Sequence, residues 1–127
     1  AGTVLVVEDD EQVRQLAVDS LRRAGCRVLE AFDGPDGLKV ARHHPGAIDV
    51  LVTDVSMPGF GGRRLAQHLT DERQGMAVLY MSGYMEDSVV LRGIVESGIE
   101  FLPKPFVVSD LLARVGALLS SREPPPL

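Results

Sequence analysis

The sequence has 127 residues, of which 45% are hydrophobic and 24% are charged, as expected for one globular domain. The chain is acidic, with 13 lysines and arginines against 18 aspartates and glutamates, so no broad nucleic-acid-binding face is expected. A single cysteine, Cys26, excludes an internal disulfide and a cysteine-based zinc site, and the lack of a long apolar run or secretion signal predicts a cytoplasmic location without membrane contact.

Short β-branched runs alternate with amphipathic stretches along the chain. The runs have apolar residues at successive positions, typical of strands buried on both faces, and cover residues 4–7, 27–29, 50–52, 77–81 and 99–102. Helical spacing follows each run, at residues 13–24, 38–41, 65–69, 89–95 and 111–119. Five strand–helix repeats predict a single-domain (βα)5 fold of the α/β class, a doubly wound parallel sheet with helices on both faces.

Glycines and prolines predict where several elements end. Gly25 and Gly98 would end the first and fourth helices, and Pro103 favours an edge position for the fifth strand. We expect the folded domain to cover residues 1–121, with residues 122–127 forming a Pro-rich tail or linker.

Polar residues follow the predicted strands, at the edge where open α/β sheets bind their ligands. Glu8-Asp9-Asp10 follows the first strand, Asp54 the third, Ser82 the fourth and Lys104 the fifth. Neighbouring carboxylates repel one another unless a cation lies among them, and Mg²⁺ prefers such oxygen ligands. With a hydroxyl and a lysine to bind further oxygens, the set predicts a phosphoryl-transfer site with Asp54 as nucleophile.

Each of these residues also has an ordinary structural interpretation. Asp9 and Asp10 are equally good N-caps for the first helix, and Ser82 would serve as a cap for the fourth. Asp54 alone would be a loop carboxylate, and Lys104 alone would be solvated. The functional interpretation depends on all of them falling at strand ends of one sheet.

Four motifs in this order resemble the receiver domains of bacterial two-component signalling. They are V-L-V-V-E-D-D at 4–10, V-T-D-V-S-M-P-G-F-G-G at 52–62, M-S-G at 81–83 and F-L-P-K-P-F at 101–106. The resemblance covers residues 3–120. It implies the flavodoxin-like strand order 2-1-3-4-5. It also implies a phosphoacceptor domain of a phosphorelay, which switches conformation to control an output.

The resemblance assigns roles in phosphoryl transfer and switching. It implies that Asp54 accepts the phosphoryl group of a phosphohistidine and that Lys104 binds that group. It makes Ser82 the switch hydroxyl, Phe101 the aromatic switch residue, and Pro105 the second residue of a cis peptide bond.

The resemblance also implies a Mg²⁺ cofactor and residues that tune the phosphoryl lifetime. The expected metal ligands are the side chains of Glu8, Asp9 and Asp54 and the backbone carbonyl of Ser56. Glu8 is expected to act mostly through water. Lifetime tuning is expected from Ser56, Gly83 and Tyr84, where the Tyr84 ring would limit the access of water.

The sequence departs from many receiver domains at several positions. Glu8 stands where an aspartate is common, and Phe101 replaces the more usual tyrosine. Val107 occupies a position where a hydroxyl N-cap is common, so the last helix would start less sharply. Asp10 is an additional acid, better suited to begin the first helix than to bind metal.

The sequence is compatible with more than one function. The alternative to a phosphorylated receiver is a pseudo-receiver that docks without phosphorylation. A haloacid-dehalogenase-like hydrolase would need an aspartate where Ser56 stands. The domain is expected to catalyse its own phosphotransfer and dephosphorylation without being a kinase.

The expected partners are a histidine kinase or histidine phosphotransfer domain, with an output partner at the face of the fourth helix, fifth strand and fifth helix. The motifs most resemble C-terminal receivers of hybrid sensor histidine kinases, with a separate regulator as the alternative.

Overall fold

The computed structural model describes residues 2–57, 59–82 and 100–121. Its elements in chain order are β1 (Thr3–Val7), α1 (Glu11–Arg23), β2 (Arg27–Ala31), α2 (Gly34–His43), β3 (Val50–Asp54), α3 (Gly62–Glu72), β4 (Ala77–Ser82), β5 (Glu100–Pro103) and α5 (Val108–Ser120). The strands pair in parallel in the order β2-β1-β3-β4-β5, which confirms the predicted sheet. The predicted fourth helix and the Pro-rich tail lie outside the described residues.

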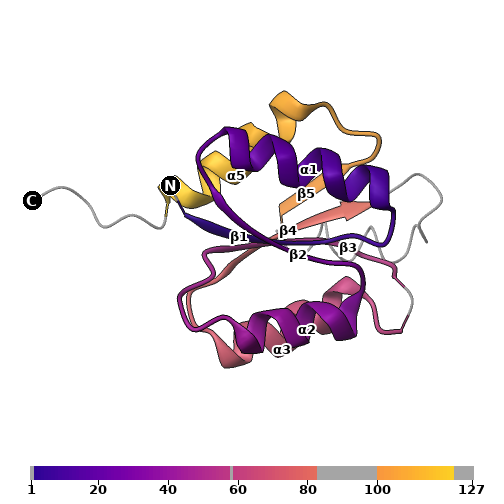
Figure 1. The fold of residues 1–127 in the computed structure, drawn as a ribbon, viewed down its shortest axis with the longest axis vertical. Helices are drawn as coiled ribbons and strands as arrows, with labels where there is room; N and C mark the ends of the chain where they lie inside the picture. Colours follow the sequence, from indigo (N-terminus) through magenta and orange to yellow (C-terminus); the bar gives the residue numbers. More distant parts are fainter. Residues whose placement is uncertain (1, 58, 83–99, 122–127) are drawn as a thin grey trace, which may run out of the picture.

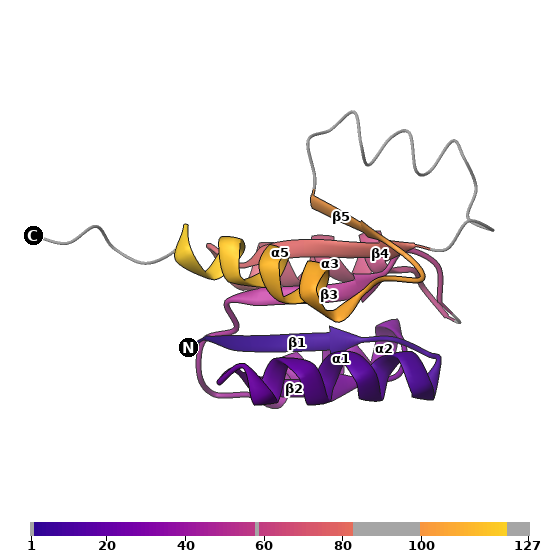
Figure 2. The same ribbon diagram turned by 90° about the horizontal axis from the view of Figure 1, so that it is seen from above.

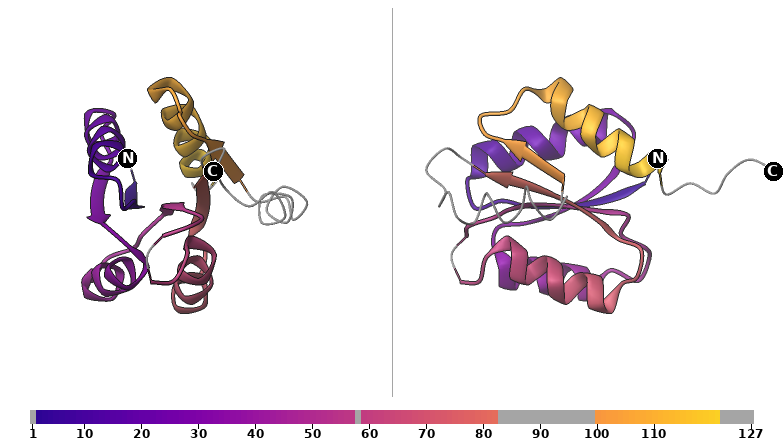
Figure 3. Two further views of the ribbon diagram at one scale, coloured as in Figure 1. Left: turned by 90° about the vertical axis from the view of Figure 1, so that its right-hand side faces the viewer. Right: turned by 180° about the vertical axis from the view of Figure 1, so that it is seen from behind.

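Helices cover both faces of the sheet. α1 and α5 lie on one face, and α2 and α3 lie on the other (Figures 1 and 3). Successive residues of a strand point to opposite faces, so Val4 and Val6 pack in the cluster with α1 and α5. Leu5 and Val7 pack in the cluster with α2 and α3. Because β1 is covered on both sides, its sequence is a continuous apolar run.

The two edge strands are less buried than the central ones. Figure 2 shows β5 at one side of the sheet, and the pairing places β2 at the other. Full burial was predicted for β2, and this is wrong: Arg27 is exposed and Glu30 is half-buried. The cause is its edge position, because β2 pairs only with β1 among the described strands. β5 ends at Pro103 on the opposite edge, as predicted.

Local capping determines where the helices that flank the site begin and end. The Asp10 carboxylate accepts hydrogen bonds from the backbone N–H groups of Gln12 and Val13, at 2.9 and 3.1 Å, so Asp10 is the N-cap of α1. Gly25, with φ at 94°, follows the end of α1 as predicted. α5 begins after Val107 without a side-chain cap, in agreement with the prediction for that position.

No helix in the described ranges is long and apolar enough to cross a bilayer.

The start of α3 lies directly against the end of β3. The Gly62 N–H donates a hydrogen bond to the Val55 carbonyl at 2.8 Å. A Cβ atom on Gly62 would lie 1.8 Å from the carbonyl oxygen of Asp54 and 2.9 Å from Thr53 Oγ1. Only a residue without a side chain fits here, so this glycine sets the spacing between α3 and the strand end that carries Asp54.

Candidate functional site

The parallel sheet brings the predicted polar residues to one edge. Asp54 and Ser82 are the last residues of β3 and β4, and Glu8 and Lys104 directly follow β1 and β5. Strand register keeps these ends level, since Asp54 is opposite Met81 and Ser82 is opposite Pro103. The site therefore combines residues far apart in sequence through the carboxyl ends of the strands.

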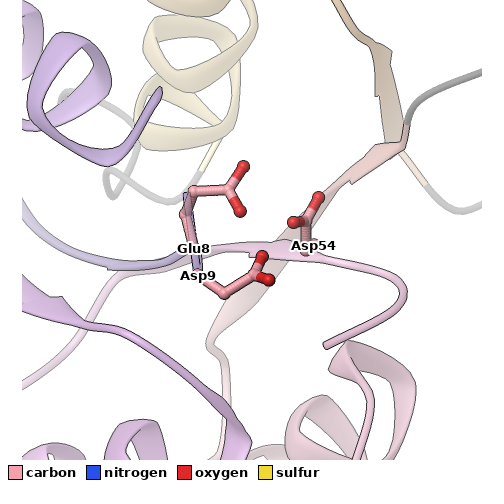
Figure 4. Close-up of side chains that lie close together, drawn as sticks. All are labelled: Glu8, Asp9 and Asp54. Atoms are coloured by element: carbon pink, nitrogen blue, oxygen red, sulfur yellow. The ribbon is translucent and has the colours of Figure 1, made fainter. Parts of the chain in front are cut away.

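Three carboxylates point toward a common space at this edge (Figure 4). Glu8, Asp9 and Asp54 each place one oxygen within 4.8 Å of the others. Glu8 and Asp54 are buried, whereas Asp9 is exposed. Oxygen atoms of this kind, gathered with one open side, are ligands that suit Mg²⁺ with part of its water shell retained. The residues present thus fit a hard divalent cation.

Lys104 provides the positive charge in this acidic site. Its Nζ forms ion pairs with Glu8 Oε1 and, at 2.7 Å, with Asp54 Oδ1. Its backbone N–H donates to the Ser82 carbonyl at 2.7 Å, which connects β5 to the end of β4. The following Lys104–Pro105 peptide bond is cis, the isomer implied by the resemblance. One ammonium group therefore bridges two buried carboxylates that would otherwise repel one another.

The crowding of charges shifts the pKa values of the site. Burial, together with the neighbouring Glu8 carboxyl, raises the pKa of Asp54 to about 8. Burial would also raise the pKa of Glu8, but hydrogen bonds with Asp54 and Lys104 lower it to about 2. Burial and Glu8 raise the pKa of Asp9 as well. These shifts let Asp54 keep its proton to a higher pH than an ordinary aspartate, and a cation among the carboxylates would favour release of that proton.

Ser82 places a buried hydroxyl at the end of β4, beside the acidic site. The residue is 2% exposed, and its Oγ has no hydrogen-bond partner among the described residues. A buried hydroxyl without a partner is energetically unfavourable, and a ligand oxygen would satisfy it. The hydroxyl lies at the end of β4, the strand next to Asp54.

The remaining predicted residues are described in part. Phe101 is half-buried, packs against the cluster beneath α2 and α3, and is opposite Tyr80 in the β4–β5 register. Ser56 is exposed just after β3. Gly83 and Tyr84, expected to tune the phosphoryl lifetime, lie outside the described residues.

Arg14, which reaches the site from α1, is not among the residues predicted from the sequence. Its Nη1 donates a hydrogen bond to the backbone carbonyl of Glu8 at 2.8 Å. The only sequence signal was a cation one turn into the helix that follows the acidic residues. That signal is weak, because arginine on a helix is most often solvated.

Comparison with known proteins identifies the family. The profile described as the response regulator receiver domain matches residues 4–116. The chain belongs to this family. The resemblance carried by the four motifs is confirmed, and the chain is a receiver domain of two-component signalling. Receiver domains generally bind Mg²⁺ at an acidic pocket and interact with histidine kinases or phosphotransfer proteins.

Individual relatives include a sensor kinase and a transcriptional regulator. This receiver domain is 32% identical over 123 residues to the sensor kinase CckA of Brucella abortus, covering 97% of the chain and 13% of that protein. It is 34% identical over 119 residues to the transcriptional regulatory protein YrkP of Bacillus subtilis, covering 94% of the chain and 50% of the relative. The chain thus spans half or less of these relatives.

A solved structure with the same fold is the receiver domain of the hybrid histidine kinase CckA. It has a TM-score of 0.77 and 36% identity, with 93% of this chain and 99% of that chain covered. A receiver domain protein from Clostridium thermocellum has a TM-score of 0.83 at 24% identity, covering 96% of this chain and 97% of its own, and supports the fold alone.

Proposed function

We propose that this receiver domain accepts a phosphoryl group from a phosphohistidine onto Asp54. The observation that carries the proposal is the position of Asp54, which ends β3 beside two further carboxylates and 2.7 Å from the Lys104 ammonium. An Asp54 oxygen would attack phosphorus while the phosphorus–nitrogen bond breaks, leaving the donor as neutral histidine after it takes up a proton. Lys104 would then pair with the new phosphoryl oxygens instead of with the free carboxylate.

Glu8, Asp9 and Asp54 would hold Mg²⁺ at this site, with the Ser56 backbone carbonyl as a further ligand. When bound, the ion would offset the charge of the carboxylates and polarise a phosphoryl oxygen. Asp9 is the exposed member of the cluster and would contribute a direct ligand on its open side. Buried Glu8, which forms an ion pair with Lys104, would support the ion mostly through water.

The switching step would depend on Ser82 and Phe101. The Ser82 hydroxyl, which has no hydrogen-bond partner within residues 2–57, 59–82 and 100–121, would bind an oxygen of phosphorylated Asp54 and draw in the connection that follows β4. Phe101, half-buried on the neighbouring strand, would then rotate inward and repack the face of the fourth helix, β5 and α5 for an output partner. Ser56, Gly83 and Tyr84 would set the phosphoryl lifetime through the access of water.

The parent protein is proposed to be a hybrid sensor histidine kinase in the cytoplasm. The 36% identity to the receiver domain of the hybrid kinase CckA supports this context. The similarity to YrkP makes a separate regulator the second candidate. The reading frame on both sides of the chain distinguishes them, because a hybrid kinase requires a catalytic ATP-binding domain in the same gene.

The phosphorylation proposal is tested by mass spectrometry of the protein incubated with acetyl phosphate and Mg²⁺. We expect one added phosphoryl group in the wild type and none in Asp54→Asn. Asp71→Asn, exposed on α3, is the matched control and should be phosphorylated like the wild type. Phosphorylation of the Asp54→Asn variant would refute the assignment, and a wild type that takes no phosphoryl group would favour the pseudo-receiver function.

A further inference from the structure

Arg14 connects three elements beneath the acidic cluster. From α1, its Nη1 donates to the Glu8 carbonyl at the end of β1, and its Nε lies 3.5 Å from Glu30 Oε1 on β2. The side chain is 15% exposed, so most of it is removed from water. The contact with Glu30 orients the guanidinium, and the hydrogen bond directs it to the main chain of the site.

The carbonyl that Arg14 binds belongs to the peptide unit that joins Glu8 to Asp9. A peptide unit is planar, so a bond to its oxygen fixes the direction in which the chain continues to the Cα of Asp9. The preceding peptide unit is fixed by the Glu8 N–H, which donates to the Ala31 carbonyl at 3.1 Å. The following one is fixed by the Asp10 N–H, which donates to the Glu8 carboxylate at 3.2 Å. With the Arg14 hydrogen bond to the Glu8 carbonyl, three consecutive peptide units around Glu8 and Asp9 are held in place.

We propose that Arg14 is a positioning residue for Mg²⁺ binding, acting through the Glu8 carbonyl to orient the Glu8–Asp9 peptide and thereby the Asp9 carboxylate. The inference rests on the proposed Mg²⁺ site. Asp9 is exposed and lies in the connection between β1 and α1, so the geometry of its main chain determines where its carboxylate lies. Groups that orient metal ligands in this way contribute substantially to metal affinity.

Simple electrostatics makes the opposite prediction. Arg14 is a cation close to a cation site, so removing its charge should strengthen Mg²⁺ binding if charge is all that matters. A role only in attaching α1 to β2 would change stability and leave the affinity for Mg²⁺ unchanged. The sign of the change in affinity therefore distinguishes orientation of the peptide from both alternatives.

The test compares Arg14→Met with Arg22→Met. Methionine keeps much of the aliphatic stem and removes every donor. Arg22 is a matched control because it lies on the same helix, pairs with the same Glu30 at 3.7 Å, and donates to a backbone carbonyl, that of Val28, at 3.3 Å. We expect Arg14→Met to weaken Mg²⁺ binding, raising the dissociation constant about tenfold. Arg22→Met should bind as the wild type does.

Two further measurements separate orientation from folding. The Glu8 carbonyl carbon resonance in metal-free protein should shift in Arg14→Met and not in Arg22→Met. Arg14→Lys keeps the positive charge and an ammonium donor but loses the planar guanidinium. Its affinity for Mg²⁺ should lie between those of the wild type and Arg14→Met. If Arg14→Met does not fold, weaker binding by Arg14→Lys with unchanged binding by Arg22→Lys supports the proposal.

Affinity equal to or tighter than that of the wild type in the Arg14 variants overturns the inference while leaving the Mg²⁺ site intact. A wild type that does not bind Mg²⁺ overturns the proposed site itself, and the metal-linked role of Arg14 with it. The wild-type titration thus separates the failure of the proposed function from the failure of this inference.

Discussion

Replacing Gly62 with alanine tests how tightly α3 is fixed against the end of β3. The added Cβ would lie 1.8 Å from the Asp54 carbonyl oxygen. A carbon atom normally approaches a carbonyl oxygen no closer than about 3.3 Å. The start of α3 and the end of β3 would therefore have to separate by more than about 1 Å, and both belong to the backbone, where no side-chain rotation relieves the contact.

The expected cost follows from this contact. Overpacking a well-packed interior costs about 1–3 kcal/mol, and a clash between backbone atoms belongs at the upper end or above. We expect Gly62→Ala to lower the free energy of unfolding by about 3 kcal/mol, a large part of the ~5–15 kcal/mol typical of a domain. The displaced strand end carries Asp54, so phosphorylation by acetyl phosphate should slow in the same variant.

Gly116→Ala is the control for this experiment. Gly116 lies within α5 and a Cβ there meets nothing within 4 Å. The same chemical change should therefore stabilise the protein by about 0.5–1 kcal/mol through helix propensity. Urea unfolding followed by circular dichroism in the presence of chelator measures both variants. If Gly62→Ala unfolds at the same urea concentration as Gly116→Ala, or a higher one, the packing argument is refuted.

Two further predictions concern charges at the site. Burial and Glu8 raise the pKa of Asp54 from 3.8 to about 8. Between these pH values the folded chain therefore binds more protons than the unfolded chain. In the presence of chelator, the free energy of unfolding should decrease as pH rises through this range. Urea midpoints from pH 5 to 8 should show this slope in the wild type and little of it in Asp54→Asn; equal slopes would contradict the assignment. Asp10→Ala should cost about 1 kcal/mol by removing the N-cap of α1. Mg²⁺ affinity should fall only slightly, through the lost charge; a loss of about tenfold or more in titration would make Asp10 a ligand.

Short-range patterns were sufficient to predict a parallel sheet and the gathering of polar residues at one of its edges, whereas the strand order came from the resemblance to receiver domains. Continuous apolar runs identify strands covered on both faces, and parallel strands necessarily bring their carboxyl ends to one edge. Asp54, Ser82 and Lys104 were located by this rule alone. The burial of β2 was overestimated, because an apolar run does not reveal whether its strand has one neighbour or two.

Other features depend on tertiary geometry that local sequence does not encode. Asp9 and Asp10 are adjacent and chemically equivalent as caps, and only the path of the chain assigns the cap to Asp10. The long Arg14 side chain reaches Glu8 because α1 packs beside β2. The requirement for Gly62 likewise arises from a neighbouring strand, not from a turn.

The ion pairs of Lys104 have a consequence for how the domain matures. With its ammonium between Glu8 and Asp54, the chain carries its own counterion at the place where repulsion is greatest. Folding can therefore precede any encounter with Mg²⁺, in contrast to small domains that remain unfolded until they bind a metal. Formation of the domain and binding of Mg²⁺ would then be separate steps, with the Lys104 ammonium offsetting the carboxylate charges until the ion arrives.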